Sequence, residues 1–449
     1  MQKVVNTPPP PPGTLSRVNL YTIALGQVIG VGVISFVGPC TALTGKSVWL
    51  AYALAVVLGF LSLLPYVFMT SAIRLGAGQY SYVATTLNYR IAGMQTLVFI
   101  VGTIGQASLG ISFGNYINSL FPQVPGVVAG VGIFIVFFII NLFGVNVMAK
   151  VQKYCSFLLI GALLMFVVAG LFNIKYPEVF DIWADDFMMN GNKGFTDALF
   201  TFMYSTVGYN MIMTYGGQAK NAKRDIPFAF IATAVSLLVL YTGVAIAAVM
   251  TMPVEAVAGQ TMVVVAREIL PTPLFILFIV GGPMMALITT INSALYYFQL
   301  PFRQACIDGW LPAKWNWNNK HGVCVPMLVF VVVCACVPQL FNFQLTAITN
   351  NMQLLTSVSG FITIFALFLF PKKYKNAWEK SHMHTPNWVY YITVVVALII
   401  NVLIFLSSAS QISTLQIIVS LIGLAICMGF GFYRAKSPKV QIKVSVWEE

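Results

Sequence analysis

The chain alternates between long apolar runs and short polar connections. A helix needs about 20 mostly apolar residues to cross the roughly 30 Å hydrocarbon core of a bilayer. Windows of this length predict twelve membrane-spanning helices, over residues 18–43, 48–73, 92–121, 125–146, 152–173, 195–216, 226–251, 273–300, 323–342, 350–370, 388–408 and 413–433. The connections leave no room for a separate soluble domain. The pattern therefore predicts an all-α polytopic membrane protein with membrane lipid around it.

Composition supports this fold class. Only 8% of the 449 residues are charged, whereas ordinary soluble proteins have about 25%. Apolar residues make up 59% of the chain, and the mean hydropathy is +0.85. A soluble protein of this size would need more polar residues to cover its surface.

The positive charges indicate how the chain crosses the membrane. If the N-terminus lies in the cytoplasm, 20 of the 24 Lys and Arg residues fall in cytoplasmic segments and 4 fall on the other side. Cytoplasmic loops are enriched in Lys and Arg, so we expect a multi-pass protein of the plasma (inner) membrane with both termini in the cytoplasm. The net charge of +12 is spread over many loops, which argues against a nucleic-acid groove.

The spans and tails divide the chain into four parts. We expect a cytoplasmic Pro-rich tail over 1–16, a ten-helix transport core over 17–370, two peripheral helices over 371–434 and a cytoplasmic tail over 435–449. The run from Pro8 to Pro12 favours an extended polyproline conformation. We interpret it as a solvated tail; a ligand for a partner protein is the alternative.

Acidic residues are absent from the middle of every predicted span. None of the 12 precedes Glu178, and each lies in a loop, a tail or at the edge of a span. Ionisable groups inside the membrane usually mark proton relays or counter-ions to charged substrates. We therefore expect neither a carboxylate proton relay nor a polyamine substrate. The sequence also contains no recognisable catalytic triad, phosphate-binding loop or cluster of metal ligands, so we predict a transporter without catalytic residues, cofactor or metal, and no enzyme.

Two predicted spans contain helix-breaking residues near their centres. Span 1 contains Gly30-Val31-Gly32, which is too dense in glycine for helix packing alone, although close packing is the alternative interpretation. Span 6 contains Ser205, Thr206, Gly208 and Asn210 within an apolar run. These two spans correspond if the first ten form two inverted repeats of five. Paired interrupted helices indicate a binding site at the membrane midplane.

The interruption in span 1 has a predictable chemistry. Free N–H groups of Val31 and Gly32 would begin a half-helix, where the helix dipole favours a carboxylate. Carbonyls near Val28, at the end of the preceding half-helix, would accept hydrogen bonds from an ammonium group. A zwitterion satisfies both ends, so the sequence predicts an amino acid as the small-molecule substrate.

Several stretches resemble the amino acid–polyamine–organocation superfamily, and are most similar to its L-type amino acid and alanine-serine-cysteine exchangers. The similar stretches are Gly30-Val-Gly32-Val-Ile34, Gly76-Ala-Gly78-Gln-Tyr80-Ser-Tyr82, Tyr204 through Pro227, and Asp308-Gly-Trp-Leu-Pro312. The resemblance implies a LeuT-like fold, with a 5+5 inverted repeat, broken spans 1 and 6, and two peripheral spans.

The resemblance also implies roles for individual residues. It assigns the substrate carboxylate to the N–H groups of Val31 and Gly32, and the amine to the carbonyls of Val28, Tyr204 and Val207. Tyr204 corresponds to an aromatic gate beside the polar Ser205, and Tyr241 aligns with a tyrosine of related exchangers. The alternative for Tyr204 and Tyr241 is a packed aromatic ring whose hydroxyl bonds to a neighbour.

Three positions depart from the family pattern. Val31 replaces a serine that is common in relatives, so a hydroxyl near the substrate carboxylate is lost while the N–H stays. Val207 replaces a glycine of relatives with large substrates and should narrow the pocket, so we expect small neutral substrates such as alanine or serine. Leu159 stands where many sodium-independent members have a lysine. Either this carrier needs no cation there, or an ion binds between span 1 carbonyls and Thr289 or Thr290.

The leading hypothesis is an amino acid exchanger that works by alternating access. The alternatives are a sodium-coupled symporter and a sensor or channel that does not transport. Nothing in the sequence indicates a need for an accessory subunit.

Overall fold

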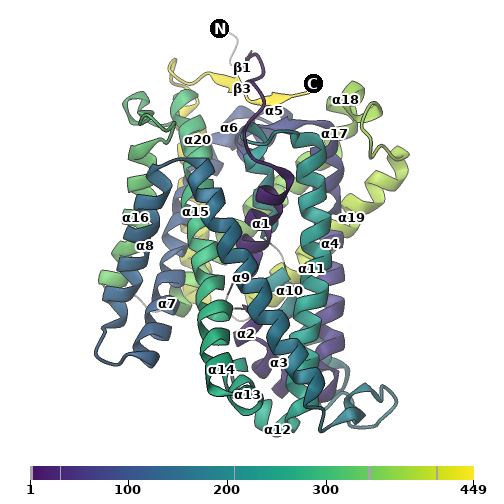
Figure 1. The fold of residues 1–449 in the computed structure, drawn as a ribbon. Helices are drawn as coiled ribbons and strands as arrows, with labels where there is room; N and C mark the ends of the chain where they lie inside the picture. The colour runs from purple at the N-terminus through teal and green to yellow at the C-terminus, as the bar shows by residue number, and fades with distance from the viewer. Residues whose placement is uncertain (1–3, 31, 207, 342–344, 411–412, 449) are drawn as a thin grey trace.

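The computed structural model describes residues 4–30, 32–206, 208–341, 345–410 and 413–448, and most of them are helical. The longer helices form a bundle, and both ends of the chain lie at the same end of it (Figure 1). In chain order, the helices of the first half are α1 (Arg17–Val28), α2 (Gly32–Ser35), α3 (Val37–Thr44), η1 (Gly45–Ser47), α4 (Val48–Ala72), α5 (Gly78–Thr86), α6 (Tyr89–Gly105), α7 (Ala107–Leu120), α8 (Gly126–Leu142), α9 (Val145–Phe172), η2 (Pro177–Phe180), α10 (Gly191–Thr206) and η3 (Tyr209–Gly217).

The second half continues the bundle. Its helices are α11 (Ala222–Thr251), α12 (Val254–Val257), α13 (Met262–Ile269), α14 (Thr272–Ile279), η4 (Val280–Met284), α15 (Met285–Ile307), η5 (Ala313–Trp315), α16 (Val325–Leu340), α17 (Leu345–Lys373), α18 (Lys375–Glu379), α19 (Asn387–Ser410) and α20 (Thr414–Arg434). Here η4 is a π-helical turn that joins α14 to α15.

The twelve predicted runs all fall on helices, and seven helical stretches among the described residues are both long and apolar enough to cross a membrane. Their bounds are Gly32–Ala72, Tyr89–Asn118, Val145–Phe172, Ala222–Thr251, Thr272–Ile307, Asn387–Ser407 and Thr414–Arg434. Helices α8 and α16 are apolar but shorter. The helical class is therefore confirmed, and twelve crossings stay a prediction.

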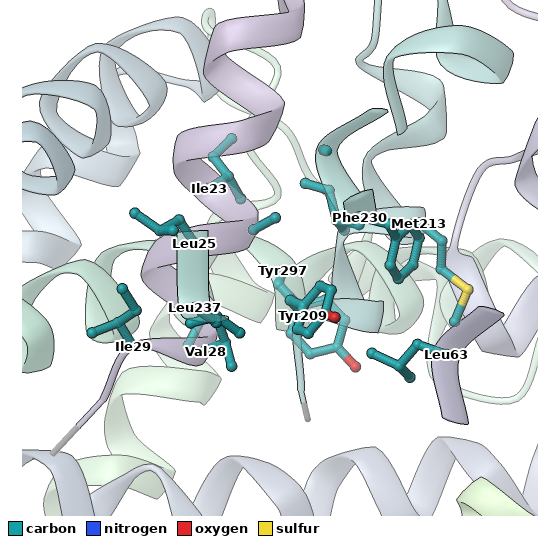
Figure 2. Packing of buried hydrophobic residues seen from close by; sticks show 14 of the residues in the cluster. Ile23, Leu25, Val28, Ile29, Leu63, Tyr209, Met213, Phe230, Leu237 and Tyr297 are labelled. Carbon is teal, nitrogen blue, oxygen red and sulfur yellow. The ribbon is translucent and has the colours of Figure 1, made fainter. Parts of the chain in front are cut away.

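Helix α1 runs through the middle of the bundle, where it contacts α9, α11 and α15 (Figure 1). Its apolar side chains belong to the main hydrophobic core, with Ile23, Leu25 and Val28 all buried. Figure 2 shows these residues together with Leu237 of α11 and Tyr209 of η3. The end of α1 is thus held on several sides.

The two chain ends are tied together by short strands. Strand β1 (Val4–Asn6) pairs in parallel with β3 (Ile442–Val444), and β2 (Arg74–Leu75) pairs in antiparallel with β4 (Val446–Trp447). Strands β1 and β3 lie at the end of the bundle that carries the termini (Figure 1).

The Pro-rich segment is mostly exposed, and its backbone is anchored to the bundle. The Arg74 guanidinium donates to the carbonyls of Pro10 and Pro11, each at 3.0 Å. Proline side chains offer no donor or acceptor, and four of the five stay exposed. The sequence reading missed this anchoring because the partner, Arg74, lies more than 60 residues away along the chain.

Candidate functional site

The interruption of the first span lies where the sequence predicts it. Helix α1 ends at Val28 and α2 begins at Gly32. Ile29 has φ −75° and ψ 86°, and the Gly30 N–H donates to the Val28 carbonyl at 2.9 Å. This is a tight γ-turn, which takes the backbone out of the helix. Val31, one of the predicted carboxylate ligands, lies outside the described residues.

The second predicted interruption is also confirmed. Helix α10 ends at Thr206, and the chain resumes at Tyr209 as the 3₁₀ helix η3. Between them Gly208 has φ +117°, a left-handed backbone conformation that glycine adopts without the steric cost of a side chain. Val207 lies outside the described residues, so its predicted effect on pocket size stays a prediction.

The two interruptions lie against each other. A Cβ added at Gly32 would lie 2.8 Å from the Cβ of Ser205, so only a residue without a side chain fits there. The Tyr241 hydroxyl of α11 lies 3.3 Å from the Val28 carbonyl oxygen and 3.5 Å from that of Ser205. It bridges the ends of α1 and α10. Tyr241 is therefore placed at the predicted site, in contact with carbonyls of both half-helices.

A second tyrosine, which the sequence reading did not single out, packs beside Tyr241. Tyr52 of α4 stacks on Phe202 with ring centroids 3.8 Å apart and lies 4.8 Å from the Tyr241 ring. Its hydroxyl is 3.2 Å from the Ser205 hydroxyl. Both tyrosines are fully buried. They fit the alternative of packed aromatics with bonded hydroxyls, but their partners belong to the predicted site.

The Val28 carbonyl already has two donors. It accepts from the Gly30 N–H and from the Tyr241 hydroxyl. A carbonyl oxygen has two lone pairs, so a substrate ammonium group would have to replace one of these bonds. The longer bond, from Tyr241, is the one that costs less to exchange.

A cavity of about 470 Å³ borders both interruptions. Gln27 of α1, Tyr204 of α10, Gly208, Asn210 of η3 and Thr290 of α15 form one part of its wall. Helices α4, α5, α6, α7, α17 and α19 and further residues of η3 and α15 contribute the rest. The volume is within the range of small-molecule sites, roughly 300–1,000 Å³.

The predicted site residues divide between the cavity wall and the layer behind it. Tyr204 lines the cavity and is 45% exposed, and its role as an aromatic gate stays a prediction. The cavity-lining residues do not include Val28, Gly32, Ser205 or Tyr241. These four hold the two interruptions together around the hydroxyl of Tyr241.

The described cavity wall is mostly apolar, with scattered polar groups and no charge. Among its described lining residues none is Asp, Glu, Lys, Arg or His, and the polar groups are amides and hydroxyls. In the part of the chain that the structure describes, no group of three His, Cys, Asp or Glu residues could hold a metal ion. Such a wall suits a ligand whose own charges cancel.

The two threonines of the predicted ion site differ in their contacts. The Thr290 hydroxyl donates to the Gly26 carbonyl of α1 at 2.9 Å, whereas the Thr289 hydroxyl bonds to Met285 and Ala286 of its own helix. Only Thr290 thus contacts an α1 carbonyl through its side chain. Leu159 is fully buried in α9 and brings no charge near α1.

A buried amide network beside α1 was not predicted. Gln152 and Ser156, one turn apart on α9, donate to the Thr22 carbonyl at 3.4 and 3.0 Å. Asn292 of α15 donates to the Gln152 side-chain oxygen at 2.8 Å. The four-residue spacing of Gln152 and Ser156 in an apolar span was the available signal, because such residues share one helix face.

The chain resembles known proteins along most of its length. A family model described as "Amino acid permease" matches residues 15–429. The chain is 22% identical to an uncharacterized protein of Methanocaldococcus jannaschii, over 63% of this chain and 66% of that protein. It is 22% identical to the aromatic amino acid transport protein AroP of Escherichia coli O157:H7, over 86% and 89% respectively. It is also 22% identical to the vacuolar cationic amino acid transporter 8 of Arabidopsis thaliana, over 78% and 60%.

Proposed function

The chain belongs to the amino acid permease family, and from this premise we propose that it is a secondary active transporter of small neutral L-amino acids, working as an exchanger. Family membership supports amino acid transport across a membrane in general. The substrate class and the coupling are the proposed part.

The uncharged cavity at the two helix interruptions carries the proposal. Its described wall offers amides and hydroxyls but no ionised side chain. Bringing an amino acid with a charged side chain into such a site would cost several kcal/mol because no counter-ion is present. A zwitterion needs only the half-helix ends, where N–H groups favour the carboxylate and carbonyls favour the amine.

The preference for small substrates rests on Val207. The cavity volume of about 470 Å³ would also admit larger amino acids. We propose that the valine side chain narrows the part of the cavity beside the interruption of α10. Of the relatives of this chain, one is named for aromatic and one for cationic amino acids.

We propose the same architecture that the resemblance implies. The core over 17–370 would consist of two inverted repeats of five spans, with two peripheral spans over 371–434. Both termini would face the cytoplasm across the plasma (inner) membrane. The 20 to 4 distribution of Lys and Arg supports this orientation.

The test is counterflow in liposomes that contain the purified protein. Labelled alanine should accumulate in liposomes preloaded with unlabelled alanine or serine, and much less in empty ones. Protein-free liposomes are the control. Uptake that stays at the protein-free level with every preload and every ion gradient contradicts the transport proposal. Saturable, stereoselective counterflow excludes a channel or a sensor that does not transport.

Sodium-coupled symport is the second candidate. The bond from Thr290 to the Gly26 carbonyl favours it, because this contact brings oxygen atoms of α15 and α1 together. Oxygen atoms are the ligands that hard cations prefer. Replacing sodium with choline should abolish uptake if sodium is coupled, whereas unchanged exchange refutes this alternative.

A further inference from the structure

Gln27 has an unusual environment at the interruption of α1. It immediately precedes Val28, the last residue of α1, and it lines the cavity. Its side-chain nitrogen and oxygen are both buried, and neither has a protein hydrogen-bond partner. Among the described residues it is the only side chain with both polar amide atoms in this condition.

Two other buried glutamines of the bundle, Gln152 and Gln95, have structural partners. Gln152 donates to the Thr22 carbonyl and accepts from Asn292, and Gln95 donates to Ser359. These amides join helices to one another. The Gln27 amide forms no hydrogen bond to another helix. Its neighbour Gly26, in contrast, is tightly packed against Gln152. A role in packing therefore does not explain a glutamine at position 27.

A primary amide in a binding cavity requires particular partners. It offers two N–H donors and one carbonyl acceptor. A buried amide without partners is destabilising, and a substrate that offers it both a donor and an acceptor removes this cost. An aliphatic side chain cannot do so and leaves the amide unpaired. A hydroxyl or a second amide can both donate to it and accept from it.

We propose that Gln27 is a specificity-determining residue, whose amide hydrogen-bonds the side chain of the substrate and selects polar neutral amino acids over aliphatic ones of the same size. This inference rests on the proposed function and names the substrate class more narrowly. Serine, threonine and asparagine are the favoured substrates. The backbone at the helix interruptions holds the amine and carboxylate that all amino acids share.

Threonine and valine are the decisive pair, because they differ in one hydroxyl at nearly equal volume. In liposome counterflow, unlabelled threonine should compete with labelled serine about tenfold more strongly than valine does, as expected for one hydrogen bond to a buried polar group. Gln27→Leu should bring the ratio of the two inhibition constants to about one. Gln27→Met is the second variant, since its unbranched side chain is closer in shape to glutamine.

Gln339→Leu is the matched control. Gln339 is a buried glutamine of α16 that donates to the Ala335 carbonyl at 2.9 Å and is not among the residues that line the cavity, so this substitution removes a buried amide away from the proposed site. The ratio of threonine to valine inhibition should stay at its wild-type value in this variant. Size-exclusion profiles and melting temperatures establish that each variant is folded.

The outcomes separate the two proposals. If the wild-type protein transports no amino acid, the proposed function fails. If it transports serine but threonine and valine compete equally, only the role of Gln27 fails, and this result needs no variant. If Gln27→Leu weakens the inhibition by threonine and the inhibition by valine by the same factor, Gln27 binds the part that all amino acids share. The specificity role is then overturned.

Discussion

Two glycines at the interruption of α1 provide a matched test of how the two half-helices fit together. A Cβ added at Gly32 would lie 2.8 Å from the Cβ of Ser205 and 3.3 Å from the Phe36 ring. Among the described residues, a Cβ added at Gly30 would meet only the Thr290 hydroxyl oxygen, at 4.0 Å. Neither glycine has the left-handed backbone conformation that would itself exclude alanine. The two positions therefore differ mainly in available space.

The magnitude follows from these distances. Carbon atoms in contact normally lie about 3.5–4.0 Å apart, so Gly32→Ala must displace α2 from Ser205 by roughly 1 Å. Overpacking of this kind costs about 1–3 kcal/mol. Gly30→Ala has no such clash and is expected to change the free energy of unfolding by less than about 1 kcal/mol. Because α2 begins at Gly32, the displacement also moves the predicted carboxylate ligands, and substrate affinity should fall at least about tenfold.

The assay combines thermal unfolding in detergent with equilibrium binding of labelled alanine. Gly32→Ala should show a lower melting temperature and weaker binding, while Gly30→Ala should keep both close to wild type. Equal behaviour of the two variants would refute the placement of α2 against Ser205. Loss of binding in Gly30→Ala alone would place the substrate nearer to Thr290 than we infer.

Three further predictions concern contacts away from this pair. Burial raises the pKa of Asp308 to about 6 from 3.8, so the folded state binds a proton that the unfolded state releases. The free energy of unfolding should therefore rise by up to about 3 kcal/mol as the pH falls from 7 to 4. Denaturant titrations of the wild type and of Asp308→Asn should differ by this pH-dependent component, which the variant lacks. Tyr241→Phe removes the hydroxyl that bridges the Val28 and Ser205 carbonyls and should lower the free energy of unfolding by about 1 kcal/mol. An unchanged denaturation midpoint would contradict this prediction. Arg17→Met leaves the buried Asp225 carboxylate without its 2.9 Å ion pair and should destabilise the protein by about 1–2 kcal/mol. In thermal melts, the same substitution should have no such effect when Asp225 is already replaced by Asn.

The sequence predicted the helical runs well because lipid imposes a simple requirement on the chain. A backbone segment in hydrocarbon has to satisfy its own hydrogen bonds, so an apolar run of sufficient length becomes a helix. The interruptions were predictable for a related reason. Gly30, Gly32 and Gly208 lie where a continuous helix is least stable, and Gly208 adopts a conformation that disfavours other residues.

The candidate site was only partly predictable. Tyr204 and Thr290 line the cavity, as their positions near the interruptions suggested. The partners of Tyr241 could not be known in advance, because its ring reaches the Val28 carbonyl across 213 positions of the chain. Gln27 gave no signal in the sequence, since a single glutamine in an apolar span is equally consistent with an amide that bonds its neighbours.

The sequence by itself determined the class of protein, the location of the helix interruptions and the scarcity of charge, because these depend on residue type and on short-range geometry. Only the tertiary structure decided which groups meet. It ties β1 to β3 across more than 400 residues, anchors the Pro-rich segment on Arg74, and leaves the Gln27 amide buried without a hydrogen-bond partner. Such pairings depend on packing between distant helices, and a local pattern carries no information about the neighbour that packing will provide.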